Sequence, residues 1–153
     1  MKWRIFGTKY HPTSTSISLM GIDMSSMVAK PHAAASNEAL QHFQKLLEFE
    51  TDCWDVHYAT NNNLQDFVLV DVRGEELFNR SHIPHAINIP HRKIDEARLQ
   101  EYPKNTLFVV YCAGPHCNAT ERAAIRLARL NRPVKKMIGG ITGWLDEGFE
   151  LTN

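Results

Sequence analysis

The chain has 153 residues, of which 43% are hydrophobic, and its 17 lysines and arginines are balanced by 17 aspartates and glutamates. This length suits one α/β core with an N-terminal extension, because two independent domains would each be unusually small. A formal net charge of zero gives no general field that would attract nucleic acid or an anionic membrane. We therefore expect neither as a partner, and any preference for anions must be local.

The cysteine count favours a reducing compartment. Three cysteines cannot all pair within one chain, and a domain of this size does not need disulfides for stability. Free thiols are then expected to serve chemistry or core packing. The basic opening segment Met1–Phe6 is interrupted by His11 and Pro12 before any apolar stretch long enough for a signal peptide or a membrane span. The prediction is a soluble cytoplasmic protein.

The first predicted elements are an arm and two helices. Residues 1–35 mix Ser, Thr, Met and Gly without sustained periodicity, which predicts an irregular extension. A helix is predicted from about Ser36, because three apolar residues then recur at helical spacing: Leu40, Phe43 and Leu47. A short second helix follows Asp52 and ends near Asn62, and its Cys53 is expected to be a packing residue.

Four short apolar runs follow, separated by segments that can hold helices: 67–70, 86–89, 107–111 and 134–138. Such alternation is typical of a parallel sheet in an α/β protein. Ligands of these sheets bind beyond the carboxyl ends of the strands. Three runs lead directly into Asp71, Cys112 and Gly139–Gly140, so we expect these residues to share one edge of the sheet.

Cys112 occupies a strand-to-helix turn, because it ends the run 107–111 and precedes a helix predicted over 120–130. The N–H groups that open a helix have no internal partners and favour an anion beside them. A reactive thiolate is therefore expected at Cys112.

Three motifs in the same order resemble the signatures of rhodanese-like domains. The first joins residues 69–73 to Glu76-Leu77-Phe78 and to 82–90, the second is Val109-Val110-Tyr111-Cys112, and the third is 138–144. The resemblance spans roughly residues 36–150, with residues 1–35 outside it. It implies one rhodanese-like three-layer domain, residues 36–153, in which a central parallel sheet is flanked by helices.

The resemblance implies a sulfurtransferase. In active members of the family, the cysteine at the position of Cys112 takes a sulfane sulfur from a donor such as thiosulfate and holds it as a persulfide. It then passes that sulfur to a thiol or a cyanide-like acceptor, and no metal or organic cofactor is required. A protein acceptor and a homodimer both stay open.

The loop after Cys112 would stabilise the persulfide anion through its backbone N–H groups, with Gly114 supplying backbone angles that other residues resist. The loop residues assigned to this site are Ala113, Gly114, Pro115, His116, Asn118, Ala119 and Thr120. Compared with the family, the loop is longer and lacks an arginine before Thr120, so Arg122 or a protonated His116 is the candidate replacement. The missing arginine also argues against the phosphatases built on this fold.

Cys117 has three alternative roles: a packing residue, an auxiliary thiol that resolves a persulfide or forms a disulfide, or the nucleophile itself. The rival to the enzyme is a catalytically silent rhodanese-like module that binds a protein or senses oxidation.

Supporting roles are expected for Asp71 and Arg73, which could bond each other and loop backbone under the site. His82 matches a structural histidine of the family motif. The histidines do not follow a zinc spacing, so no metal site is predicted. His85 replaces a glycine of the motif, and a glycine at positive φ is costly to replace, so the backbone there is expected to differ.

Overall fold

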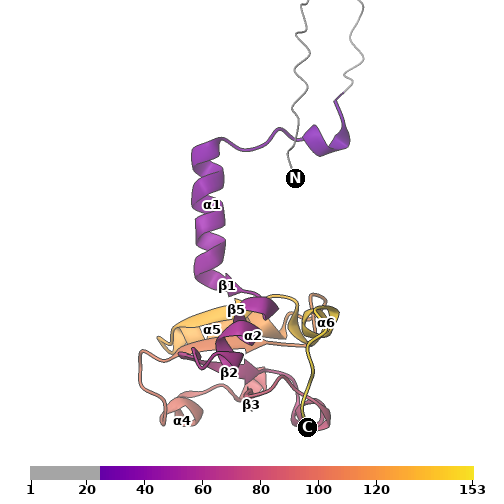
Figure 1. The fold of residues 1–153 in the computed structure, drawn as a ribbon. Coiled ribbons are helices and arrows are strands. Elements are labelled where there is room, and N and C mark those ends of the chain that lie inside the picture. Colours follow the sequence, from indigo (N-terminus) through magenta and orange to yellow (C-terminus); the bar gives the residue numbers. More distant parts are fainter. Residues whose placement is uncertain (1–24) are drawn as a thin grey trace, which may run out of the picture. The chain divides into compact units, whose positions relative to one another are not determined.

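The computed structural model describes residues 25–153, and the chain divides into two units, with the division falling between Ala35 and Ser36. Residues 25–35 hold one short 3-10 helix, η1 (Met27–Ala29), which begins where the Ser26 hydroxyl accepts the N–H of Ala29 at 3.3 Å. Ser36–Asn153 is a compact unit that contains all the other described elements (Figure 1). Most of the predicted arm, residues 1–24, lies outside the described residues.

Over residues 25–153, five parallel strands form one sheet in the order β1-β5-β4-β2-β3. They are β1 (Glu50–Thr51), β2 (Phe67–Asp71), β3 (Ile87–Asn88), β4 (Leu107–Tyr111) and β5 (Val134–Met137). The predicted parallel sheet and its four predicted strands are confirmed. The edge strand β1 was not predicted, because a pair of polar residues carries no hydrophobic run.

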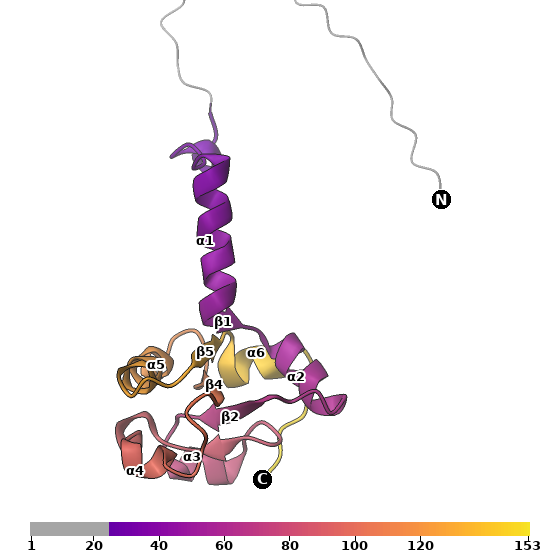
Figure 2. The ribbon, with the colours of Figure 1, turned by 90° about the vertical axis from the view of Figure 1, so that its left-hand side faces the viewer.

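Helices cover both faces of the sheet (Figure 2). The helices of this unit are α1 (Ser36–Phe49), which projects away from the sheet in both views (Figures 1 and 2), and α2 (Cys53–Asn61), α3 (Glu75–Arg80), α4 (Glu96–Leu99), α5 (Ala119–Arg129), α6 (Gly140–Asp146) and the 3-10 helix η2 (His91–Lys93). Because side chains alternate along a strand, Val110 packs with α4 and α5 on one face, while Val109 packs with α2 and α6 on the other. The predicted three-layer α/β architecture is confirmed.

The buried faces of α2 and α5 follow from their sequences. The Asp52 carboxylate caps α2 by accepting the N–H of Asp55 at 2.8 Å, and Cys53 is 5% exposed in the core, as predicted. In α5, Ala123 and Leu127 are buried against the sheet, as the helical spacing indicates.

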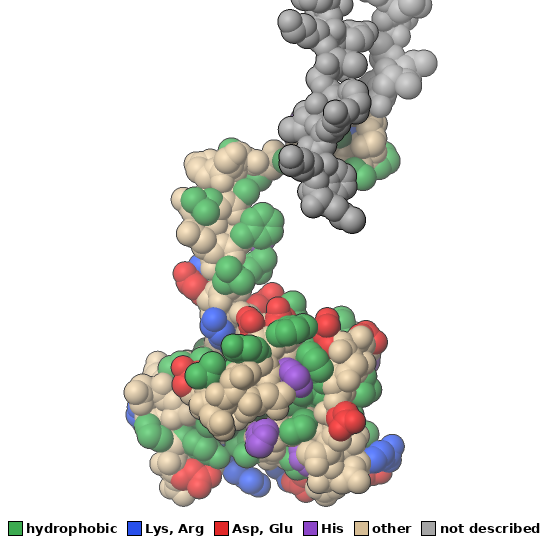
Figure 3. Space-filling model, viewed as in Figure 1, with side chains coloured by type: hydrophobic (Ala, Val, Ile, Leu, Met, Phe, Trp, Pro, Cys, Tyr) green, Lys and Arg blue, Asp and Glu red, His purple; other side chains and the backbone are tan. Residues whose placement is uncertain are grey.

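Helix α1 forms where the apolar spacing predicts it, but no residue of α1 is buried. Its apolar residues Leu40, Phe43 and Leu47 are all more than half exposed, and Figure 3 shows green side chains along this helix. Its carboxyl end is tied to the sheet, because Lys135 Nζ donates to the Leu47 carbonyl at 2.8 Å. Within residues 25–153, no helix has both the length and the apolar character needed to cross a bilayer.

Candidate active site

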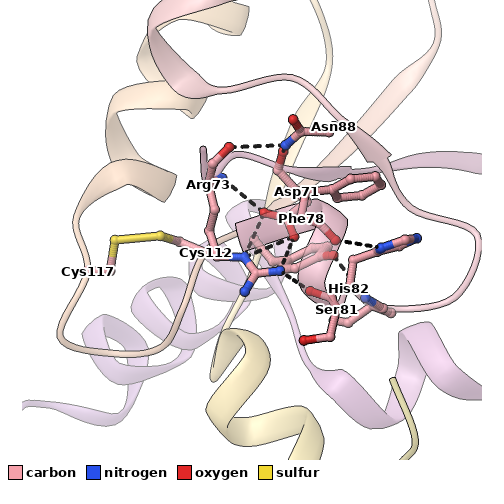
Figure 4. A network of polar contacts seen from close by, with 10 residues as sticks. Asp71, Arg73, Phe78, Ser81, His82, Asn88, Cys112 and Cys117 are labelled. Atoms are coloured by element: carbon pink, nitrogen blue, oxygen red, sulfur yellow. Dashed lines mark hydrogen bonds and ion pairs between the residues drawn. A yellow bond between two sulfur atoms is a disulfide. The ribbon is translucent and has the colours of Figure 1, made fainter. Parts of the chain in front are cut away.

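Cys112 lies directly beyond β4, at the carboxyl edge of the sheet, and is 4% exposed. Its sulfur is joined to that of Cys117 in a disulfide, with the two Cα atoms 6.4 Å apart (Figure 4). The intervening loop closes through a turn, in which the Cys117 N–H donates to the Gly114 carbonyl at 3.0 Å. This turn returns the chain toward Cys112, and the disulfide is one of the alternatives open for Cys117. The general expectation of free thiols holds only for Cys53.

The start of α6 holds the loop in place. The Ile141 N–H donates to the Cys112 carbonyl at 3.0 Å, and both the N–H and the hydroxyl of Thr142 donate to the Ala113 carbonyl at 2.9 Å. Gly140 has a φ of +58°, and a Cβ there would overlap the Cys112 carbonyl oxygen. The predicted meeting of Cys112 with Gly139–Gly140 is therefore confirmed.

Gly114 is required for a different reason from the one expected. Its φ is not in the left-handed region, but an added Cβ would lie 2.5 Å from the Thr142 hydroxyl oxygen. The constraint at Gly114 is thus close packing against α6 rather than an unusual backbone angle.

The N-terminus of α5 opens beside the disulfide. Asn118 stands at the N-cap without capping the helix, because its side-chain oxygen accepts from Arg122 Nε at 3.3 Å. The first N–H groups of an α-helix have no acceptor within the helix, so this end favours an anion. Cys117 contributes no free donor to this end, since its N–H is bonded to Gly114.

A cavity of about 340 Å³ opens at this edge of the sheet. It is lined by Cys112, Gly114, Pro115, Cys117, Thr120, Glu121, Lys136, Met137, Ile138, Gly139 and Gly140. Its volume suits a small inorganic or organic donor rather than a large ligand. Three further loop residues, Ala113, His116 and Asn118, line a neighbouring surface hollow with Cys117, whereas Ala119 is the first residue of α5.

Lys136 is a cavity residue that the sequence analysis missed. Its Nζ lies 3.0 Å from Glu50 Oε1 and 3.1 Å from Glu121 Oε1. The hydrogen bond to Glu50 and, to a smaller extent, that to Glu121 raise the pKa of the Lys136 ammonium above its usual range. The sequence did hold one signal for Lys136: it is a charged residue near the carboxyl end of a predicted strand, next to the edge where the site was expected. Arg122 is exposed on the flank of α5 and is not among the residues that line the Cys112 cavity.

Asp71 and Arg73 form a buried pair at the end of β2, with Arg73 Nη2 2.6 Å from Asp71 Oδ2 (Figure 4). Arg73 also donates to the Ser81 carbonyl at 2.7 Å, and Asn88 Nδ2 donates at 3.0 Å to the carbonyls of both Asp71 and Arg73. The predicted bond between the two side chains is present. The backbone that Arg73 holds, however, belongs to the turn before β3 and not to the loop after Cys112.

Tyr111 links that turn to β4. Its hydroxyl accepts the Ile83 N–H at 3.1 Å, and burial, followed by the Asp71 charge, raises the pKa of the Tyr111 phenol. Tyr111 is therefore a neutral hydrogen-bonding residue of the core.

The two motif histidines occupy the same turn. His82 stacks on Phe78 with ring centroids 3.7 Å apart, and its Nδ1 lies 3.0 Å from the Phe78 carbonyl (Figure 4). His85 has a φ of +67°, which is the left-handed region that glycine adopts readily and a residue with a Cβ resists. Within residues 25–153, no three His, Cys, Asp or Glu side chains gather in a way that could hold a metal ion.

An α/β domain with a cysteine at the carboxyl edge of its parallel sheet is the arrangement expected from the sequence motifs, and a comparison with protein families gives the same result. The model of the rhodanese-like domain matches residues 56–147, more than half of the chain, so the chain belongs to the rhodanese-like domain family.

Individual relatives differ in what they are named for. The BH2092 protein of Bacillus halodurans is 38% identical, with a TM-score of 0.75 over 78% of this chain and 87% of that one. The HTH-type transcriptional regulator Rv0324 of Mycobacterium tuberculosis is 38% identical over 87 residues, which are 56% of this chain and 38% of the regulator. A thiosulfate sulfurtransferase of Pseudomonas aeruginosa shares the fold at 20% identity, with a TM-score of 0.59 over 76% of this chain and 21% of that one.

Proposed function

We propose that residues 36–153 form a cytoplasmic sulfurtransferase domain that carries a sulfane sulfur on Cys112. The observation that carries this proposal is the placement of Cys112 in the lining of a small cavity, next to the uncapped N-terminus of α5. A persulfide anion formed there would be stabilised by the first N–H groups of the helix. The proposed catalytic residue is Cys112, and the loop backbone acts as the anion cradle.

The first half-reaction starts from the reduced protein. The Cys112 thiolate attacks the outer sulfur of thiosulfate, a new S–S bond forms, and the original S–S bond breaks to release sulfite. An acceptor thiolate then attacks the terminal sulfur, which leaves Cys112 as a thiolate and the acceptor as a persulfide. Neither step changes the overall number of electrons, so no redox cofactor is needed.

The charges beside the cavity favour a donor with little negative charge. Lys136 is the cation among the cavity residues, and Glu50 and Glu121 together outweigh its charge. We therefore expect a low-molecular-weight persulfide to be a better donor than the dianion thiosulfate. Increasing the salt concentration should bring the transfer rates with the two donors closer together, because salt screens the exposed carboxylates.

Cys117 is proposed as a resolving thiol, because the disulfide with Cys112 demonstrates that the two sulfurs can meet. If no acceptor arrives, the Cys117 thiolate attacks the inner sulfur of the Cys112 persulfide, and hydrosulfide leaves as the Cys112–Cys117 bond forms. An external dithiol reductant then restores both thiols. The same disulfide favours a second candidate function, in which the domain senses oxidation without turning over sulfur.

Turnover measurements on the reduced protein distinguish these functions. Cys112→Ser should abolish sulfur transfer from thiosulfate or a persulfide to a thiol or to cyanide, whereas Cys117→Ser should retain it and lose hydrosulfide release in the absence of acceptor. Cys53→Ala is the matched control, because Cys53 is a buried packing thiol. A wild-type protein with no transfer from either donor, but with a reversible disulfide, would overturn the enzyme in favour of the sensor.

A further inference from the structure

A groove separate from the cysteine cavity lies between α5 and η2, with a volume of about 480 Å³. It is lined by six residues, four of them arginines: His91, Arg92, Arg122, Ile125, Arg126 and Arg129. No carboxylate lines it, although the chain as a whole has equal numbers of acidic and basic residues. Positive charge is thus concentrated at one place on a protein of zero formal net charge.

The helix places these arginines in a row. Arg122, Arg126 and Arg129 follow one face of α5, and seven residues of helix span about 10 Å. The acidic residue of α5, Glu121, does not line the groove and is bonded to Lys136 instead. It therefore leaves the guanidinium groups of the groove uncompensated.

The groove arginines also lack partners. Over residues 25–153, neither Arg92, Arg126 nor Arg129 makes an ion pair or a side-chain hydrogen bond, and Arg122 contacts only the neutral Asn118. Like charges held side by side repel one another, so an anion that bridges them would relieve this repulsion. By contrast, Arg73 and Arg132 each donate several hydrogen bonds to protein oxygens.

His91 adds an imidazole to the wall. Its Nδ1 is buried without a hydrogen-bond partner, and burial, followed by the charges of Arg92, Arg122 and Arg126, lowers the pKa of the imidazole. An anion bound among the arginines would oppose their effect and raise that pKa. The ring therefore offers a direct reporter of binding.

The chemistry of the groove fits adjacent phosphate groups. Guanidinium groups bind phosphate through paired N–H donors, and a span of about 10 Å accommodates two or three successive phosphates. Ile125, half exposed beside the arginines, provides an apolar contact for an attached organic group. A long nucleic-acid backbone would extend beyond a groove of this size.

We propose that this groove binds a small molecule that carries two or more adjacent phosphate groups. A free oligophosphate and a nucleotide both carry adjacent phosphate groups. The nucleotide alone has an organic group that could pack on Ile125, so this contact would distinguish the two ligands. The site is independent of the proposed sulfur transfer, because its residues are not those of the Cys112 cavity.

Calorimetric titration of the full chain with tripolyphosphate, ADP and a short single-stranded oligonucleotide tests the proposal. Arg126→Gln with Arg129→Gln should weaken tripolyphosphate and ADP about tenfold or more, which is the loss expected for about 1.4 kcal/mol. The matched control, Arg80→Gln with Arg98→Gln, removes the same charge from exposed positions outside the groove. It should weaken binding less than about twofold if long-range charge is screened by salt.

Two further readouts make the result decisive. NMR titration of His91 should show its pKa rising when tripolyphosphate is added, and Arg126→Lys with Arg129→Lys should bind with intermediate affinity, because charge is kept and the paired donors are lost. If ADP binds more tightly than tripolyphosphate, the ligand of the groove is a nucleotide rather than a free oligophosphate. The proposal would be overturned if neither tripolyphosphate nor ADP bound saturably, or if only the oligonucleotide bound. It would also be overturned if the control variant weakened binding as much as the groove variant does.

Discussion

Asp71 and Arg73 lie two residues apart at the end of β2 and form a nearly inaccessible ion pair, with side chains 0% and 8% exposed. Arg73 Nε lies 3.0 Å from both carboxylate oxygens, and the Arg73 N–H donates to Asp71 Oδ1 at 2.9 Å. The pair holds the Ser81 carbonyl as well, so it connects β2 to the turn before β3.

Arg73→Leu is expected to lower the free energy of unfolding by about 3–5 kcal/mol, because it leaves the Asp71 carboxylate buried without its partner. Urea denaturation measures the loss. Arg80→Leu is the control, since it breaks the exposed pair with Glu76 and should cost less than about 1 kcal/mol. Comparable losses in the two variants would contradict a supporting role for Arg73.

His85→Gly is expected to stabilise the protein by about 0.5–1 kcal/mol, because His85 adopts a φ of +67° and glycine reaches this region without steric cost. The greater freedom of glycine in the unfolded chain offsets part of the gain. Thermal or urea unfolding measures it. Asn131→Gly, at a φ of +53°, should gain less, because asparagine tolerates this region better than histidine. A lower stability of His85→Gly would show that the imidazole makes a compensating contact.

Gly114→Ala is expected to lower the free energy of unfolding by about 1–3 kcal/mol, because its Cβ would lie 2.5 Å from Thr142 Oγ1. Thr142→Ala in the same chain should recover part of the loss, since it removes the atom in conflict. Gly140→Ala should not be rescued in this way, because its conflict is with the backbone of Cys112. Additive effects of the Gly114 and Thr142 changes in urea denaturation would argue against packing as the constraint.

Cys53 is expected to alkylate slowly below pH 10 in the folded, reduced protein. Burial raises the pKa of the Cys53 thiol to about 11, and the thiolate is the reactive form. The alkylation rate of Cys53 should therefore increase with pH up to about 11. At pH 8, Cys112 and Cys117 should be alkylated faster than Cys53. Iodoacetamide labelling followed by peptide mass mapping measures the three rates. Cys53 reacting first at pH 8 would contradict its role as a packing residue.

Much of the fold was predictable because the apolar runs of β2 and β4 are local signals that point to a buried parallel sheet. The meeting of Cys112 and Gly140 was predictable for the same reason, since both follow strands that end at one edge. The sequence alone does not decide whether Cys112 and Cys117 bond, because the bond depends on a turn within the loop rather than on periodicity. Lys136 was missed because its role comes from Glu50 and Glu121, which are distant in the sequence.

The exposed face of α1 shows a second limit of sequence patterns. The spacing of Leu40, Phe43 and Leu47 predicts the helix correctly, but amphipathic spacing does not say whether the apolar face packs within the same unit.

The most direct test of the central proposal is to locate the transferred sulfur. The reduced protein would be incubated with thiosulfate and, separately, with a low-molecular-weight persulfide, trapped with an alkylating reagent and mapped by peptide mass spectrometry. The account predicts the gain of one sulfur atom on Cys112, retained in Cys117→Ser and more abundant with the persulfide than with thiosulfate. Sulfur found on Cys117 instead, or on neither residue with either donor, would contradict it.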